Sequence, residues 1–223
     1  MPTANPDTVE RARMSEGSTS SGAVYQMVVA ELASRKNGAG TLIDVGCGTG
    51  QLFPMVRSSC TRYIGVDVVR YEGFPAEAEF ISANLDNRPA TELPDESADV
   101  VVCIETIEHL ENPRALIREL ARLARPGALL LVTTPNQLSW LSLMTLVVKG
   151  EFNQFQEAPG LYPAHITHLL EADMIRIARE CGLTSIRIVY SDEGRFPFTR
   201  FHWPRMFRGR RFSDNLMLVA VKP

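Results

Sequence analysis

The sequence has little of three things that would each indicate a particular class of protein: cysteine, long apolar runs and excess charge. Only four of its 223 residues are cysteine and no two form a Cys-x-x-Cys pair, so we expect reduced structural thiols rather than a disulfide framework. No apolar run approaches the roughly 20 residues that cross a bilayer, and the first residues lack the apolar core of a signal peptide. A net charge of −3 disfavours a general nucleic-acid binder and DNA in particular. Together these absences predict a soluble, cytoplasmic protein.

Length and composition favour one domain with a substantial core, because 45% of the 223 residues are hydrophobic. Residues 1–22 mix Pro, Ser, Thr, Gly and charges without a period, which predicts a mobile N-terminal arm. We expect residues 23–223 to form the domain, interrupted by long connections at about 137–168 and 191–214. Connections of that length are usually functional or disordered, and the aromatic content of both favours function.

Segments with strand and helix patterns alternate along the domain. A lead helix is expected from about Val24 to Gly38, a second opens at Asn112-Pro113 and breaks at Pro126-Gly127, and a third closes at Cys181-Gly182. This alternation predicts an α/β fold with a parallel sheet and helices on both of its faces. The expected strands are 41–45, 63–66, 79–82, 99–104, 128–134, 186–190 and 215–221.

The run from Thr41 to Gly50 ends an apolar strand in glycines at alternate positions, Gly46, Gly48 and Gly50. Glycine lets the backbone approach a ligand closely and adopt positive φ. We expect a helix to start near Gln51, so that a strand, a glycine turn and a helix N-terminus form a nucleotide-binding corner. The Gly-x-Gly-x-Gly spacing differs from the Gly-x-Gly-x-x-Gly of dinucleotide sites. An ordinary glycine-rich loop is the alternative.

A second apolar strand ends in Asp67, about twenty residues beyond Asp44. A carboxylate at this distance is placed to accept hydrogen bonds from ribose hydroxyls. The alternative is an aspartate that caps a turn.

With these motifs, and with the later segments 93–103, 104–113 and 125–136, the chain resembles the class I S-adenosylmethionine-dependent methyltransferases of the methyltransferase-domain branch. The resemblance covers about residues 22–190. It implies a Rossmann-like, seven-stranded, mostly parallel sheet with an antiparallel final strand, and S-adenosyl-L-methionine as cofactor.

The same resemblance implies a set of cofactor-binding residues. Asp44 and the glycine turn would line the methionine half, and Asp67 would take the ribose. Asn84 would stand near the adenine, where the family commonly has an acidic residue, and its amide oxygen can accept from the adenine amino group. The expected set is Asp44, Gly46, Cys47, Gly48, Gly50, Asp67, Val68, Asn84, Leu85 and Ile104.

Acidic and imidazole side chains follow the strand that would face the transferable methyl group. Glu105, Glu108 and His109 would share one face if a helical turn begins at Glu105. This segment resembles ubiquinone-type O-methyltransferases and small-RNA 3′-end 2′-O-methyltransferases, and in the latter two Glu and two His hold a metal. The second histidine would be His165, with His168 as its rival.

We therefore expect Glu105, His109 and His165 to be catalytic. Glu105, Glu108, His109 and His165 form a hypothetical site for Mg²⁺, Mn²⁺ or Zn²⁺. The alternatives are that Glu105 contacts the methionine amino group and that His109 is a packed, hydrogen-bonded residue.

The segments that would recognise the acceptor resemble those of methyltransferases in sugar and cell-surface glycan biosynthesis. The resemblance implies a lid made of 134–136, 140–148, 150–152 and 165–167. Alternatively, 140–148 is a helix that packs on the core.

The connection at 191–214 holds six arginines interleaved with aromatic residues. It could bind a phosphate-bearing acceptor, because arginine pairs bidentately with phosphate. It could equally contact an anionic membrane surface, form a homodimer interface or remain a solvated loop. Single-stranded RNA is disfavoured by the acidic chain as a whole.

The leading hypothesis is a methyltransferase that forms an O-methyl group on a small-molecule or glycan acceptor. The alternatives are metal-assisted 2′-O-methylation of an RNA 3′ end and a cofactor-binding scaffold without turnover.

Overall fold

The computed structural model describes residues 9–10, 12–13, 22–34, 39–87, 91–157 and 164–223. Most of the predicted mobile arm and the predicted end of the lead helix near Gly38 lie outside these ranges. Of the arm, residues 9–10 and 12–13 have helical backbone, and the Ala12 carbonyl accepts a hydrogen bond from the Tyr71 hydroxyl at 2.5 Å.

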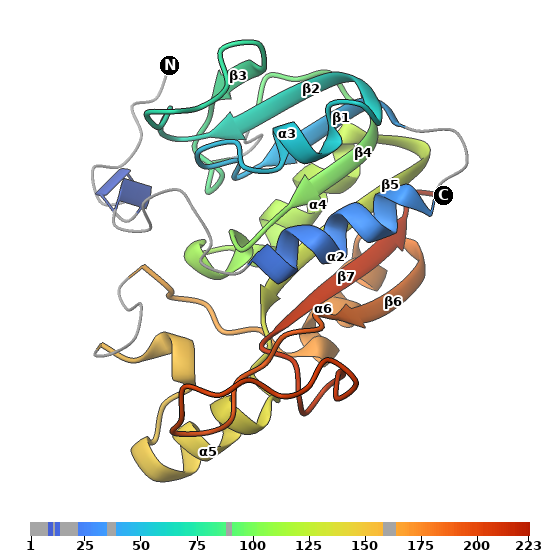
Figure 1. Cartoon of the computed structure of the whole chain (residues 1–223). Helices are drawn as coiled ribbons and strands as arrows, with labels where there is room; N and C mark the ends of the chain where they lie inside the picture. Colours follow the sequence, from blue (N-terminus) through green and yellow to red (C-terminus); the bar gives the residue numbers. More distant parts are fainter. Residues whose placement is uncertain (1–8, 11, 14–21, 35–38, 88–90, 158–163) are drawn as a thin grey trace.

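One seven-stranded sheet carries helices on both faces (Figure 1), which confirms the predicted fold. The strand order is β3-β2-β1-β4-β5-β7-β6, and β7 runs antiparallel to both of its neighbours. The central strand β4 is Val-rich because both of its faces are covered. The strands are β1 (Ala39–Val45), β2 (Cys60–Asp67), β3 (Glu79–Ser82), β4 (Ala98–Cys103), β5 (Ala124–Pro135), β6 (Thr184–Tyr190) and β7 (Asn215–Val221).

The apolar core is divided by the sheet into two layers. On one face, Val24 and Val28 of α2 and Leu52 before α3 pack on the sheet; on the other, Leu120 of α4 and Ile177 of α6 do so. None of the helices in the described ranges combines the length and apolar character that crossing a bilayer demands. The helices are α2 (Gly22–Ala33), α3 (Phe53–Val56), α4 (Pro113–Leu123), α5 (Trp140–Lys149) and α6 (Glu171–Glu180), with short 3₁₀ turns η1 (Ile107–His109) and η2 (Asn153–Phe155).

Local sequence signals account for several helix ends. The Asn112 side chain caps α4 by accepting the Ala115 N–H at 2.9 Å, as predicted. Two helix boundaries differ from the prediction, and β2 and β5 both start earlier than expected. The helix expected near Gln51 is the single turn α3, which starts at Phe53, because Gly50 at φ +76° extends the glycine turn. Helix α4 ends at Leu123, before Pro126-Gly127, because the chain joins β5 from Ala124.

The sheet topology brings both long connections to one edge. Strands β1, β2, β4 and β5 are parallel, so their carboxyl ends share an edge. Because β7 is antiparallel to β5 and β6, it starts where β6 ends, at that same edge. The connections 137–168 and 191–214 therefore both leave from the carboxyl edge, and Figure 1 shows α5 and the 191–214 segment extending beyond it.

Candidate active site

The glycine turn follows β1 and is tied to β2 through the backbone. The N–H groups of Gly46 and Cys47 donate to the Val66 carbonyl at 2.7 and 3.1 Å. Gly46 has φ +77°, and a Cβ there would lie 2.1 Å from Thr106 Oγ1. Only glycine fits this position, because any side chain would clash with Thr106.

Asp67 at the end of β2 is joined directly to this turn. Its Oδ2 accepts the Gly48 N–H at 2.9 Å and its Oδ1 accepts the Val68 N–H at 2.7 Å. Burial raises the pKa of this carboxyl and the backbone donors partly offset the rise. Because each carboxylate oxygen can accept more than one hydrogen bond, the carboxylate retains acceptor capacity for ribose hydroxyls.

Asp44 is the buried acid of β1. Its Oδ2 accepts the Tyr63 hydroxyl at 2.5 Å, whereas its buried Oδ1 has no hydrogen-bond partner within the described part of the chain. Burial raises the pKa of Asp44 to about 7. An orphaned buried acceptor beside a glycine cradle fits a ligand that carries a cationic amino group. S-adenosylmethionine is such a ligand.

The remaining predicted cofactor residues line the same strand ends, but Asn84 has a local role. Its Oδ1 accepts the Asp86 N–H at 3.0 Å and so closes a turn. Leu85 and Ile104 are buried apolar residues. Burial raises the pKa of the Cys47 thiol, so this cysteine is a packed, protonated residue of the turn. Contact of these residues with a cofactor stays a prediction.

The prediction that Glu105, Glu108 and His109 share one helical face is wrong, because no helical turn begins at Glu105. The 3₁₀ turn η1 starts at Ile107, and Glu105 precedes it with φ +46°. Its side chain is oriented toward β7, where Asn215 Nδ2 donates to Oε2 at 2.8 Å. Its N–H donates to Thr133 Oγ1 at 2.9 Å. Burial raises the pKa of Glu105 to about 7.

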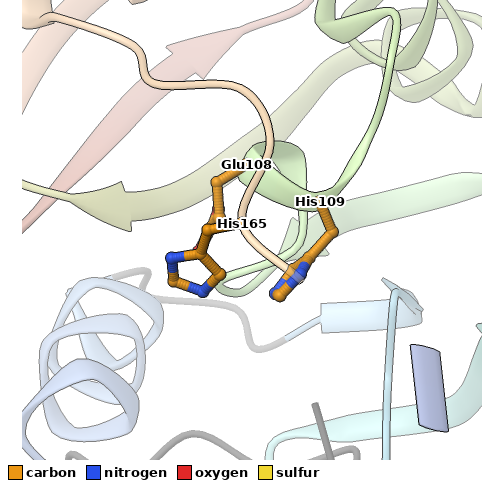
Figure 2. A group of neighbouring side chains, drawn as sticks. All are labelled: Glu108, His109 and His165. Carbon is orange, nitrogen blue, oxygen red and sulfur yellow. The ribbon is translucent and has the colours of Figure 1, made fainter. Parts of the chain in front are cut away.

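Three other side chains do converge: Glu108, His109 and His165 have ligand atoms within 4.8 Å of one another. Figure 2 shows the two imidazole rings side by side on segments from different parts of the chain, with ring centroids 4.6 Å apart. The Glu108 carbonyl accepts the N–H groups of Ile166 and Thr167 at 3.0 and 2.9 Å. This backbone pairing holds His165 against η1.

The rival histidine lies outside this cluster. His168 is exposed and packs on Phe152 and Phe155, at 5.5 and 5.7 Å between ring centroids. Of the two candidates, the structure therefore places His165 beside His109.

Hydrogen bonds and burial set the protonation of the cluster. His109 Nδ1 lies 2.9 Å from the Ala164 carbonyl; since a carbonyl only accepts, Nδ1 carries a proton, and in the neutral ring Nε2 has the lone pair. Burial, and then the charge of His109, lower the pKa of His165 to about 3, so His165 is neutral at pH 7. Burial, and then Glu105, raise the pKa of Glu108 well above its usual value. The cluster thus offers Nε2 of His109 and the neutral imidazole of His165 to a hydroxyl group or to a metal ion.

Several polar residues that shape the site carry no recognisable sequence signal. Tyr63, Thr133 and Asn215 stand within apolar strands, where each resembles an ordinary strand residue, and Thr134 was expected only as part of a lid. Thr134 Oγ1 donates to Glu108 Oε2 at 3.2 Å. Their roles follow only from which strands the fold makes neighbours.

The family model described as "Methyltransferase domain" matches residues 22–188. A Mycobacterium tuberculosis protein, named as a probable S-adenosylmethionine-dependent methyltransferase, is 35% identical over 121 residues, which are 52% of this chain and 43% of that protein. The ubiquinone biosynthesis O-methyltransferase of Cupriavidus pinatubonensis is 27% identical over 167 residues, 72% of this chain and 64% of that enzyme. The chain thus spans less than two thirds of the length of these curated relatives.

Solved structures share the fold. A SAM dependent methyltransferase from Archaeoglobus fulgidus superposes with a TM-score of 0.64 at 18% identity, over 89% of this chain and 94% of that one. A SAM dependent methyltransferase from Aquifex aeolicus gives a TM-score of 0.59 at 16% identity, over 98% of this chain and 100% of that one.

Proposed function

Since the chain belongs to the class I S-adenosylmethionine-dependent methyltransferases, in the methyltransferase-domain family, we propose that it methylates a hydroxyl oxygen of a small-molecule or glycan acceptor. The names of relatives that are ubiquinone biosynthesis O-methyltransferases support oxygen as the methylated atom. The four cysteines, all free thiols, support a reducing compartment such as the cytoplasm.

The cofactor is held by the unit described above. The orphaned carboxylate oxygen of Asp44 would accept from the amino group of the methionine moiety, the glycines between Gly46 and Gly50 would allow close approach, and Asp67 would accept from the ribose. When bound there, S-adenosylmethionine supplies a methyl group attached to a sulfonium sulfur. The thioether that remains is a good leaving group. The protein's share of catalysis is then to orient and deprotonate the acceptor.

The observation that carries this proposal is the orientation of His109. With its Nδ1–H directed to the Ala164 carbonyl, Nε2 is the nitrogen that can take the proton of a hydroxyl group. His165, 4.6 Å away between ring centroids, is neutral at pH 7 because burial lowers its pKa to about 3. His165 is therefore a weak base, so it orients the acceptor and leaves the proton to His109.

A second candidate function is metal-assisted methylation of an RNA 3′ end, and the approach of Glu108, His109 and His165 within 4.8 Å favours it. A carboxylate and two imidazoles suit Mn²⁺ or Zn²⁺. The four-residue set implied by the resemblance is incomplete, however, because Glu105 is hydrogen-bonded to Asn215 and lies outside the cluster. This geometry favours the first proposal.

The test is methyl transfer from labelled S-adenosylmethionine to an acceptor panel: sugar nucleotides, quinone precursors, simple phenols and RNA oligonucleotides, each with and without chelator. We expect transfer to a hydroxyl-bearing small molecule or sugar that survives chelation. His109→Ala should lower kcat by about 10²- to 10⁴-fold and leave cofactor affinity unchanged. The matched control is His168→Ala, which removes the exposed neighbouring histidine and should retain activity.

Three outcomes would overturn the proposal. Chelator-sensitive transfer to RNA ends, together with zinc or manganese binding that Glu108→Gln abolishes in calorimetry, would establish the second candidate. Unchanged turnover in His109→Ala would remove the proposed base. Cofactor binding without transfer to any acceptor would favour a non-catalytic scaffold.

A further inference from the structure

Exposed apolar side chains gather at one end of the molecule. Of the large apolar residues exposed in the described ranges, all but Met55 lie on α5 or between residues 196 and 211. We call these side chains, together with the exposed arginines between them, the apolar–basic surface. Its apolar members are Trp140, Met144, Val147, Val148, Phe198, Phe201, Met206 and Phe207.

The exposed side of helix α5 is apolar. Trp140, Met144, Val147 and Val148 follow the i, i+4, i+7, i+8 spacing of one helix face, and Val147 is 80% exposed. The opposite side is buried through Leu141 and its neighbours. A helix with one side packed on its own protein normally turns polar residues outward, whereas the outer stripe of α5 is apolar and exposed.

The two parts of the surface are joined. The Trp140 N–H donates to the Arg211 carbonyl at 2.8 Å, and the Arg211 guanidinium lies 5.6 Å from the centre of the Trp140 ring. Asn136 Nδ2 donates to the Arg210 carbonyl at 2.8 Å. Figure 1 shows α5 and the 191–214 segment adjacent to each other beyond the carboxyl edge of the sheet.

The surface is basic on an acidic protein. Six arginines against three acidic residues give segment 191–214 a net charge of +3, whereas the whole chain carries −3. Some of this charge is paired, since Arg195 contacts Asp214, Arg205 contacts Asp192 and Arg210 contacts Glu171. The exposed arginines that alternate with the exposed apolar residues are Arg200, Arg205, Arg208, Arg210 and Arg211.

We propose that the apolar–basic surface docks the protein on an anionic lipid bilayer. Aromatic and aliphatic side chains enter the boundary between headgroups and acyl chains, while arginines bind the lipid phosphates. The complementarity is local, because the segment that carries most of the exposed aromatic side chains has a net charge of +3 on a chain whose net charge is −3. It requires no membrane-spanning segment.

Two other occupants fit less well. In a symmetric homodimer the same patch would face itself, which would bring like-charged arginines together, whereas interface cores are depleted of charge. Single-stranded RNA requires free aromatic faces for stacking. Trp203 is already stacked on Phe196, with ring centroids 3.5 Å apart. Much of the exposed apolar area is aliphatic, as at Val147 and Met206.

The surface is continuous with the candidate active site. After α5 the chain forms η2, where the Phe155 ring lies 5.4 Å from the ring of His165. Docking would therefore present the acceptor site to molecules carried at the membrane, and a lipid-linked acceptor follows if the proposed O-methylation is correct. This last step rests on the proposed function, but vesicle binding is measured without acceptor or turnover, so that the two proposals fail separately.

The test is co-sedimentation of the full chain with vesicles of phosphatidylcholine alone and of phosphatidylcholine mixed with phosphatidylglycerol. We expect binding to the anionic vesicles that high salt weakens. Arg200→Gln/Arg208→Gln should lower the partition coefficient by about fivefold per charge removed. Val147→Ser/Phe201→Ser should lower it at least as much while leaving part of the salt dependence. These four side chains are exposed, so the variants should fold, as thermal unfolding would verify.

Matched controls lie outside the surface. Met55→Ser removes an exposed apolar residue and Arg179→Gln an exposed arginine on α6, and both should bind vesicles as the native chain does. Absence of anionic-vesicle binding, or equal loss in the controls, would overturn the proposal. So would a dimer in analytical ultracentrifugation, or retention of an RNA oligonucleotide, that the surface variants abolish while vesicle binding persists.

Discussion

The backbone N–H of Gly48 donates to Oδ2 of Asp67 at 2.9 Å, across 19 residues of sequence. This bond joins the glycine turn after β1 to the acid at the end of β2. The two cofactor-binding motifs expected from the sequence are therefore one structural unit, so a change in Asp67 affects both the ribose contact and the position of the turn.

Replacing Asp67 by Asn should weaken binding of S-adenosylhomocysteine by about ten- to a hundredfold, because hydrogen bonds to a charged acceptor contribute about 1.5–3 kcal/mol. The amide cannot accept hydrogen bonds at both positions, so one backbone donor also loses its partner. Calorimetric titration measures the affinity. The control is Glu77→Gln, an exposed acid of the same region, which should bind normally. Equal affinities in the two variants would show that Asp67 does not contact the cofactor.

Binding of S-adenosylhomocysteine should tighten as the pH rises from 6 to 8. Burial raises the pKa of Asp44 to about 7, and the cationic amino group of the ligand requires the ionised carboxylate. Binding near pH 7 should therefore release a proton, which titrations in buffers of different ionisation enthalpy measure. Asp44→Asn should bind weakly and lose this proton release. Native binding without proton release would argue against the contact.

The stability of the native chain relative to Asp44→Asn should fall as the pH rises from about 4 to 7. Because the folded pKa of about 7 exceeds the reference value of 3.8, the folded state binds the proton more tightly than the unfolded state. The contribution of Asp44 to stability is thus present at low pH and lost as the carboxyl ionises. At about 1.4 kcal/mol per pKa unit the difference reaches about 4 kcal/mol. Urea unfolding of both proteins across this pH range measures it, and parallel curves would contradict it.

Gly46→Ala should destabilise the protein more than Gly182→Ala. Both glycines have positive φ, +77° and +75°, so both changes carry the strain of a left-handed residue, about 1–2 kcal/mol. Only at Gly46 would the new Cβ clash, 2.1 Å from Thr106 Oγ1, whereas nothing lies within 4 Å at Gly182. The difference between the two unfolding free energies isolates the clash. Equal losses would mean that Thr106 moves aside freely.

Asn136→Ala should loosen the 191–214 segment without unfolding the sheet. The Asn136 amide donates to the carbonyls of Arg210 and Ser213, both at 2.8 Å, and these acceptors would lose their partner. Trypsin should then cleave after the arginines of the segment faster than in the native protein. Asn153→Ala is the control, because the hydrogen bonds of Asn153 in the described structure use its backbone. Unchanged cleavage would show that other contacts hold the segment.

Much of the fold could be predicted because residues close together in the sequence specify its helices, strands and turns. The glycine triplet, the Asn112 cap and the apolar strands each reflect neighbouring residues or a burial period of two or 3.6. The site was less predictable. Glu105 was expected on one helical face with Glu108 and His109 on spacing alone, but its positive φ and the amide of Asn215, 110 residues away, turn it toward β7.

The sequence alone determined the α/β sheet, the glycine turn and the acid that follows it, because short-range patterns specify which residues are buried and where the backbone must bend. The tertiary structure decided that His165 rather than His168 joins His109, and that the apolar stripe of α5 faces outward beside the arginine-rich segment. Those outcomes depend on strand order and on backbone pairing between distant segments, such as Glu108 with Ile166. No local pattern encodes such pairings.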